Sequence, residues 1–207
     1  MRQHIYYAFP TPIITYKVGR DFTEEELKVA REEKQQTGIG NTASISHRIL
    51  DNPAMANLKK FTEECLHDWY INVYAPKYPD MAKLQITQSW LNYTKPGENH
   101  HTHYHPNSIV SGCIYLSADY DSDCIRFINN NSRAWNIIEA ESNAFNCTDF
   151  HIGVGTGDVV LFPSQTFHSV PKTESDKTRI SLAFNSFWVG EIGKPNDDVN
   201  YLKVNVR

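Results

Sequence analysis

The chain lacks the segments that direct a protein into or across a membrane. It has no run of about 18 apolar residues, and residues 1–7 contain neither an apolar core nor a small-residue cleavage site of a signal peptide. Neither a transmembrane helix nor secretion is therefore indicated. We expect a soluble, cytoplasmic protein.

Paired cysteines and an excess of positive charge are also missing. Cys65, Cys113, Cys124 and Cys147 show no CxxC spacing, and we interpret them as reduced thiols. The formal net charge of −4 provides no chain-wide basic field, so a nucleic-acid partner is not indicated. No internal repeat or linker divides residues 1–207, and we expect a single domain.

The first part of the chain, about residues 20–80, is predicted to be helical after an edge strand at residues 13–18. Thr23 and Glu26 form a capping-box pattern for a helix over residues 23–35. Asn52 and Pro53 begin a second helix, whose apolar residues recur at helical spacing before Pro76 and Pro79 end it. This apolar stripe comprises Met55, Leu58, Phe61, Cys65, Leu66, Trp69 and Val73.

From residue 84 the apolar period changes from that of a helix to that of a strand. Strand-like segments separated by polar turns cover residues 84–93, 109–117, 124–128, 158–162 and 179–189. Short strands in such a series favour a sandwich, jelly roll or barrel. We therefore predict a mainly β fold with flanking helices and a β core over about residues 84–190.

Four of the nine histidines lie in the segment His-His-Thr-His-Tyr-His at residues 100–105. In an extended chain, residues two apart share a face, so His101, His103 and His105 could present their imidazoles to one ion. A single histidine is more often a plain surface residue, but the HxHxH run favours a metal site.

A second polar signal follows about sixty residues later. A Gly-Asp turn leads into a buried strand that stops at Pro163, and His168 follows where the chain re-enters the sheet. On the next strand Arg179, Ser181 and Ala183 share one face. An Arg beside small residues can bind a carboxylate through two parallel hydrogen bonds, whereas the plainer interpretation is a cation at a strand end.

Several of these motifs, in this order, resemble those of the 2-oxoglutarate/Fe(II)-dependent oxygenases. They are His103-Tyr104-His105-Pro106-Asn107-Ser108, Ser111-Gly112-Cys113-Ile114-Tyr115-Leu116, Leu161-Phe162-Pro163-Ser164, and His168 followed by Arg179-Ile180-Ser181. The chain is most similar to a small, uncharacterised bacterial and phage branch with HxHPxS and SGxYYL motifs. A phage-encoded protein would act in the host cytoplasm.

This resemblance implies a double-stranded β-helix, a cupin-like jelly roll, that holds Fe(II) through His103, His105 and His168, with His101 as an alternative ligand. It implies that Arg179 binds the C5 carboxylate of 2-oxoglutarate, aided by Ser181, Asn92 and Tyr115. O₂ is the second cosubstrate, and no catalytic residue beyond the metal site is implied. The activity implied is a dioxygenase that hydroxylates a substrate and releases succinate and CO₂.

One position departs from the common pattern of two histidines and one carboxylate. His105 stands where Asp or Glu is expected. Three imidazoles could bind the iron, His101 could pair with His103, or Glu98 or Asp158 could supply the carboxylate.

Two other functions fit the same segments. The first is a three-His cupin-type metalloprotein independent of 2-oxoglutarate, and the second is a non-catalytic β-sandwich binding module. The substrate is not encoded in any motif, although Trp135 and Phe145 lie in a candidate substrate loop at residues 129–149. A homodimer is left open.

Overall fold

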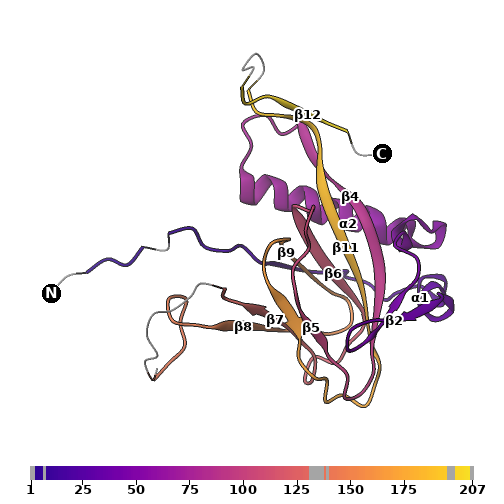
Figure 1. Cartoon of the computed structure of the whole chain (residues 1–207). Coiled ribbons are helices and arrows are strands. Elements are labelled where there is room, and N and C mark those ends of the chain that lie inside the picture. The colour runs from indigo at the N-terminus through magenta and orange to yellow at the C-terminus, as the bar shows by residue number, and fades with distance from the viewer. Residues whose placement is uncertain (1–2, 7, 131–137, 139, 195–198, 206–207) are drawn as a thin grey trace.

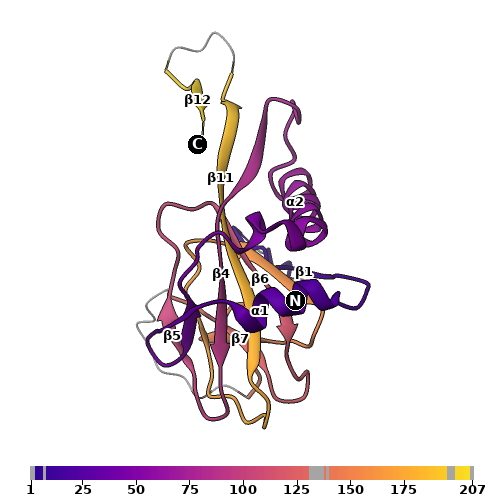
Figure 2. The same cartoon turned by 90° about the vertical axis from the view of Figure 1, so that its right-hand side faces the viewer.

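The computed structural model describes residues 3–6, 8–130, 138, 140–194 and 199–205. Two antiparallel sheets face each other as a jelly roll, with helices on the outer face of the larger one (Figures 1 and 2). This is the mainly β architecture with flanking helices that the sequence predicts.

The larger sheet has eight strands, and the chain order shows several crossovers. Its path is β1 (Ile14–Lys17), β9 (Asp158–Pro163), β6 (Val110–Ser117), β11 (Arg179–Ile192), β4 (Ala82–Thr94), β3 (Thr42–Ser44) and β2 (Gln35–Thr37), with β12 (Leu202–Val204) paired to β11. Strand β1 pairs only with β9 among the described strands, which confirms the predicted edge strand. Its two preceding prolines suit that position, because proline cannot donate to a neighbouring strand.

The smaller sheet has four strands in the order β5 (His100–His103), β10 (His168–Val170), β7 (Cys124–Ile128) and β8 (Asp149–Gly153). It carries most of the histidine run. The predicted extended segment is shorter than expected, since β5 ends at His103 and the chain then turns through Pro106 and Asn107. Asn107 has a left-handed backbone with φ 57°, a conformation that Asn tolerates well.

Both helical segments begin as predicted; the first ends earlier than expected, and the second ends just before Pro76, as predicted. The helix α1 (Glu24–Glu32) has the complete Thr23–Glu26 capping box, but residues 35–37 form β2 rather than its last turn. After the short turns η1 (Ile49–Asp51) and η2 (Pro53–Met55), the helix α2 (Ala56–Trp69) passes into a π-helical turn η3 (Tyr70–Tyr74). Ala75, left-handed at φ 44°, ends the helical segment just before Pro76.

The apolar stripe of α2 packs against the outer face of the larger sheet. Leu58, Leu66 and Trp69 are fully buried in one cluster with Leu91 and Leu182 of the sheet. The alternate residues of β11, Ile180 and Phe184, belong to the same cluster. The helix therefore covers the outer face of the larger sheet.

The inner face of the larger sheet meets the smaller sheet in a second, smaller apolar cluster. It contains Tyr115, Ile125, Phe127, Val154, Val160 and Phe162.

Gly112 lies where β6 passes close to its neighbours, since a Cβ there would meet the Phe184 ring at 2.6 Å and the Val160 carbonyl oxygen at 2.9 Å. Only glycine fits at this crossing.

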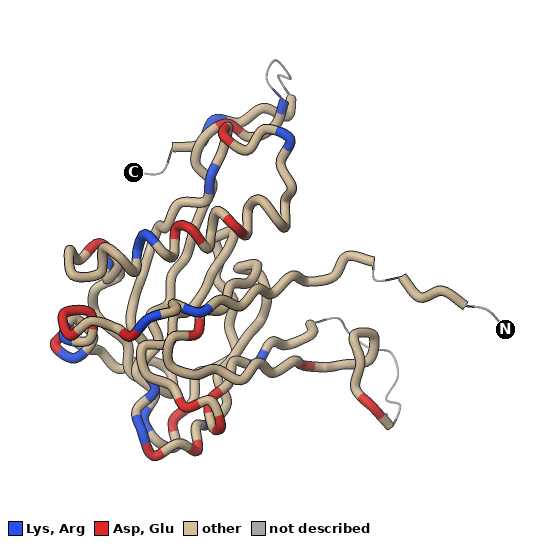
Figure 3. Tube along the Cα trace, turned by 180° about the vertical axis from the view of Figure 1, so that it is seen from behind, with Lys and Arg blue, Asp and Glu red and all other residues tan. Residues whose placement is uncertain are grey.

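Lys and Arg are interspersed with Asp and Glu over the described part of the chain, without a continuous basic stripe (Figure 3). Within the same residues, no helix combines the length and the apolar character that crossing a membrane requires.

Candidate metal centre and cosubstrate site

The pairing of β5 with β10 brings the two histidine-containing segments together. His103 and His168 are direct partners in the register of the smaller sheet. His105 follows β5, and its backbone N–H donates to the Ser164 carbonyl oxygen at 2.9 Å, which holds it beside the end of β9. Three histidines from two distant segments therefore meet between the sheets.

The nitrogen atoms of His103, His105 and His168 lie within 4.8 Å of one another. The Nδ1 atoms of His103 and His168 face the carbonyl oxygens of His101 and Thr166 at 2.8 and 3.0 Å. A carbonyl only accepts, so Nδ1 carries the proton in both rings and Nε2 offers its lone pair. The Nε2 atoms of His105 and His168 are 3.3 Å apart, close enough to share one ion.

The protonation state of these rings suits metal binding. Burial lowers the pKa of His105 to about 4, and it also lowers the pKa values of His103 and His168. The neighbouring histidines act in the same direction on His105 and His168. All three imidazoles are therefore neutral at pH 7, as a metal ligand must be.

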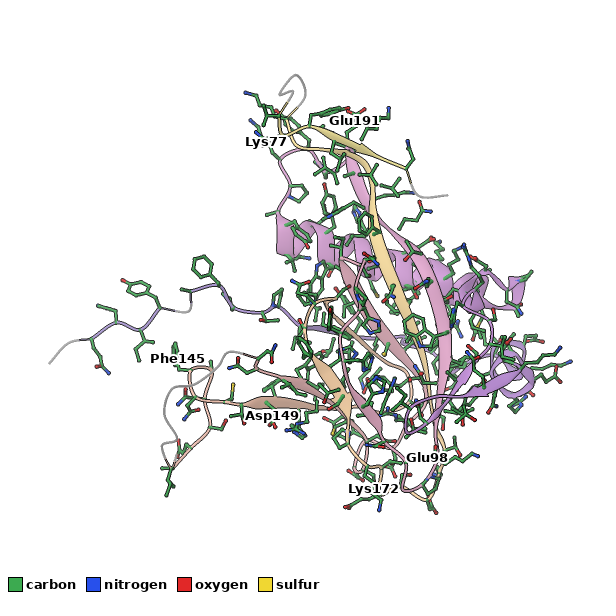
Figure 4. All side chains as sticks on the ribbon, in the orientation of Figure 1. Lys77, Glu98, Phe145, Asp149, Lys172 and Glu191 are labelled. Atoms are coloured by element: carbon green, nitrogen blue, oxygen red, sulfur yellow. The ribbon has the colours of Figure 1, made fainter. Side chains whose placement is uncertain are left out.

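The candidate carboxylates are engaged elsewhere. Glu98 accepts the backbone N–H of Lys95 at 2.8 Å in a turn at the lower end of the roll (Figure 4). Asp158 pairs with Lys17 and accepts the N–H of Gly155 at 2.8 Å. In the described part of the chain, the groups that could hold a metal ion contain histidine alone.

His101, the alternative ligand, lies in a second group with His100 and His103 rather than with His168. The two groups share His103 and no other residue. A ring-to-ring contact of 5.6 Å between His105 and Trp90 of β4 borders the first group on the side of the larger sheet.

Arg179 is buried at the start of β11, with 3% of its surface exposed. One guanidinium nitrogen donates to the Cys124 carbonyl oxygen at 3.2 Å, and the group lies 5.8 Å from the centre of the Tyr115 ring. Its Nε–H has no hydrogen-bond partner in the described part of the chain. Among the described residues, no carboxylate forms an ion pair with it, so this buried cation has no counter-ion of its own.

The polar side chains around Arg179 also lack hydrogen-bond partners among the described residues. Ser181 is paired in register with both Asn92 and Tyr115, and all three are at least 94% buried. Within the described residues, none of their side chains forms a hydrogen bond. Burial raises the pKa of Tyr115, which keeps its phenol protonated and able to donate. Buried polar groups are rarely left unpaired, so this surface is suited to a polar ligand.

Thr94 belongs to the same surface and was not singled out from the sequence. It is the register partner of Arg179 and is fully buried, and no described residue forms a hydrogen bond with its hydroxyl. Its position two residues after Asn92 on one strand is the signal that could have identified it.

Of the two candidate substrate contacts, the structure describes only Phe145, which lies away from the histidine group. Phe145 is 54% exposed and lies toward the far end of the projection formed by β7 and β8 (Figure 4). Trp135 lies outside the described residues.

Comparison with known proteins gives a partial family match. Residues 88–185, a little under half of the chain, match a family model described as "Putative 2OG-Fe(II) oxygenase". No curated protein matches.

Solved structures of such oxygenases are similar over most of the chain at low sequence identity. A 2OG-Fe(II) oxygenase family oxidoreductase from Burkholderia pseudomallei aligns with TM-score 0.58 and 12% identity, over 85% of this chain and 83% of its own. HygX from Streptomyces hygroscopicus, solved with nickel, 2-oxoglutarate and hygromycin B, aligns with TM-score 0.54 and 14% identity, over 85% of this chain and 82% of its own. A prolyl hydroxylase from Trichoplax adhaerens aligns with TM-score 0.53 and 14% identity, over 86% of this chain and 83% of its own. The chain thus has the fold of the 2-oxoglutarate/Fe(II) oxygenases, and its central strands match a family model of that group.

Proposed function

We propose that the chain is a 2-oxoglutarate- and Fe(II)-dependent dioxygenase that hydroxylates a substrate. In this proposal His103, His105 and His168 hold the iron and Arg179 binds the C5 carboxylate of 2-oxoglutarate. The observation that carries the proposal is the buried Arg179, which forms no ion pair with a carboxylate among the described residues and begins a strand of the sheet that faces the histidine-bearing sheet.

The donor set fits both groups. Three neutral imidazoles, each with one nitrogen within 4.8 Å of the others, suit a divalent ion such as iron, and they leave its other coordination positions for ligands that are not protein. The planar guanidinium can donate two parallel hydrogen bonds to a carboxylate. The proposed iron centre carries one more positive charge than a site with a carboxylate ligand, which should change its reduction potential.

When bound, Fe(II) with 2-oxoglutarate and O₂ supplies the oxidising power that converts a C–H bond to C–OH, with release of succinate and CO₂. The chain's own residues position the cosubstrate and exclude water. Arg179 orients the cosubstrate, while Ser181, Asn92 and the Tyr115 hydroxyl offer hydrogen bonds along its length. Phe127 and Phe162, buried beside the histidines, keep water from the reacting atoms.

The two rival functions account for less of the site. A three-His cupin-type metalloprotein needs no 2-oxoglutarate and therefore gives no reason for an unpaired buried arginine. A binding module with surface histidines would not need His168 buried beside His103. We further propose that the protein is cytoplasmic and belongs to the bacterial and phage branch whose motifs its segments resemble.

The test is an anaerobic titration of the untagged protein with Fe(II), with and without 2-oxoglutarate. We expect a weak visible charge-transfer band that requires both additions and is absent from His168→Ala. Succinate formation on admitting O₂ would follow. If the wild type binds Fe(II) but never shows the band, the cosubstrate-independent metalloprotein becomes the better hypothesis.

A further inference from the structure

The second histidine group lies at the start of β5, beside the proposed iron ligands. The rings of His100, His101 and His103 are 4.5 to 5.0 Å apart between centres, and their ligand nitrogens lie within 4.8 Å of one another. This group is closer to solvent than the first, whose third member, His168, is 95% buried. It meets the same geometric condition as the proposed iron site, and the proposed function uses only its shared member, His103.

His103 has only one nitrogen to offer to the two groups. Its Nδ1–H donates to the His101 carbonyl oxygen at 2.8 Å, so Nε2 alone carries a lone pair. One lone pair binds one metal ion. A metal in the second group therefore removes His103 from the first, which leaves only His105 and His168 there.

The chemistry of the second group selects the kind of ion. Its three potential ligands are imidazoles, and no carboxylate of the described residues joins them. Such nitrogen ligands suit Zn²⁺, Ni²⁺ and Cu²⁺, which bind a given nitrogen site more tightly than Fe²⁺ does. His100 forms no hydrogen bond within the described part of the chain, so its ring nitrogens are not engaged by another group of those residues.

We propose that His100, His101 and His103 form a second position for a divalent ion of the zinc class, and that this position and the one at His103, His105 and His168 exclude each other. Zn²⁺ in the second position withdraws His103 from the iron centre and so acts as an inhibitor. The inhibition rests on the proposed function, whereas the second binding position does not.

The experiment titrates Zn²⁺ into untagged, metal-free protein in competition with a chromophoric chelator. The proteins are the wild type, His100→Ala, His168→Ala and the double variant. We expect one tightly bound Zn²⁺ per chain in the wild type and in each single variant, because one complete group survives in each. The double variant, with both groups broken, should bind Zn²⁺ more than about 100-fold more weakly, since even changes next to a metal ligand cost about 10- to 100-fold.

His67→Ala is the matched control, because His67 is an exposed histidine on α2 away from both groups. It should bind Zn²⁺ like the wild type. Two tightly bound ions per wild-type chain would contradict mutual exclusion. Complete loss of tight Zn²⁺ binding in a folded His168→Ala, as judged by circular dichroism, would show that the second position does not exist.

A second readout separates this inference from the proposed function. His100→Ala should keep the Fe(II)/2-oxoglutarate charge-transfer band of the wild type, and in this variant Zn²⁺ can compete only at the iron position. If His168→Ala keeps that band unchanged, the proposed iron site is wrong while the zinc result still stands. If zinc binding fails and the band behaves as expected, the second position alone is refuted.

Discussion

Replacing Arg179 by Met should have opposite effects on ligand binding and on the stability of the unliganded chain. Methionine keeps a long apolar stem and removes the charge. In the wild type Arg179 is 97% buried, and among the described residues its Nε–H has no hydrogen-bond partner and its guanidinium forms no ion pair with a carboxylate. A buried charge without a partner lowers stability by several kcal/mol, which offsets its one hydrogen bond to the Cys124 carbonyl oxygen, worth about 1.5 to 3 kcal/mol. The unliganded Arg179→Met variant should therefore be at least as stable as the wild type.

Binding of 2-oxoglutarate should change in the other direction. Removing the partner of a buried carboxylate costs about 2 to 5 kcal/mol, or roughly 30- to 4,000-fold in the dissociation constant. Arg179→Lys should rescue binding only partly, because an ammonium group lacks the planar fork. Iron affinity should be unchanged, since Arg179 is not a proposed ligand.

Thermal unfolding with and without 2-oxoglutarate, in the presence of Fe(II), measures both effects. At a concentration 100 times its dissociation constant, the cosubstrate should stabilise the wild type by about 2.7 kcal/mol, or about 5 to 11 °C in Tm. Arg179→Met should lose most of this shift. Lys177→Met, which removes an exposed cation two residues away, is the control and should keep it. An unliganded Arg179→Met that is more than about 2 kcal/mol less stable than the wild type would show that Arg179 is a structural residue.

Three further predictions concern the framework of the roll. Leu66→Ala should lower the free energy of unfolding by about 2 to 5 kcal/mol, because Leu66 is fully buried between α2 and the larger sheet; denaturant unfolding measures it, and a change under 1 kcal/mol would contradict the packing. Gly112→Ala should cost about 1 to 3 kcal/mol or more by overpacking, and unchanged stability would show that β6 can move away.

The third concerns pH. Burial raises the pKa of Glu26, but its hydrogen bonds from Arg20 and Thr23 outweigh this and leave the pKa lowered. Glu26→Gln should thus lower the free energy of unfolding by about 1 to 2 kcal/mol at pH 7. The difference from wild type should shrink as pH falls below about 4.3, the ordinary pKa of Glu, through the lower folded pKa. Urea unfolding at pH 7 and at a pH below that range tests this, and a pH-independent difference would contradict it.

Much of the local structure could be predicted because it depends on neighbours in the sequence. The Thr23–Glu26 capping box needs only residues three apart, and the change of apolar period near residue 84 marks the first long strand, β4, within two residues. The two faces of β11, with Arg179 and Ser181 on one and Ile180 on the other, follow from the alternation of strand side chains. The motif order was sufficient to indicate the fold.

What the tertiary structure decided is which of these segments meet. The register of β5 with β10 places His103, rather than His101, opposite His168, and a shift by one residue would have reversed the faces. The register of β11 with β4 places Thr94 beside Arg179, 85 residues away along the chain (179 − 94 = 85). Glu98 and Asp158 could be set aside only once their own partners were visible. Such pairings depend on loop closure and on long-range strand contacts, and no local pattern encodes them.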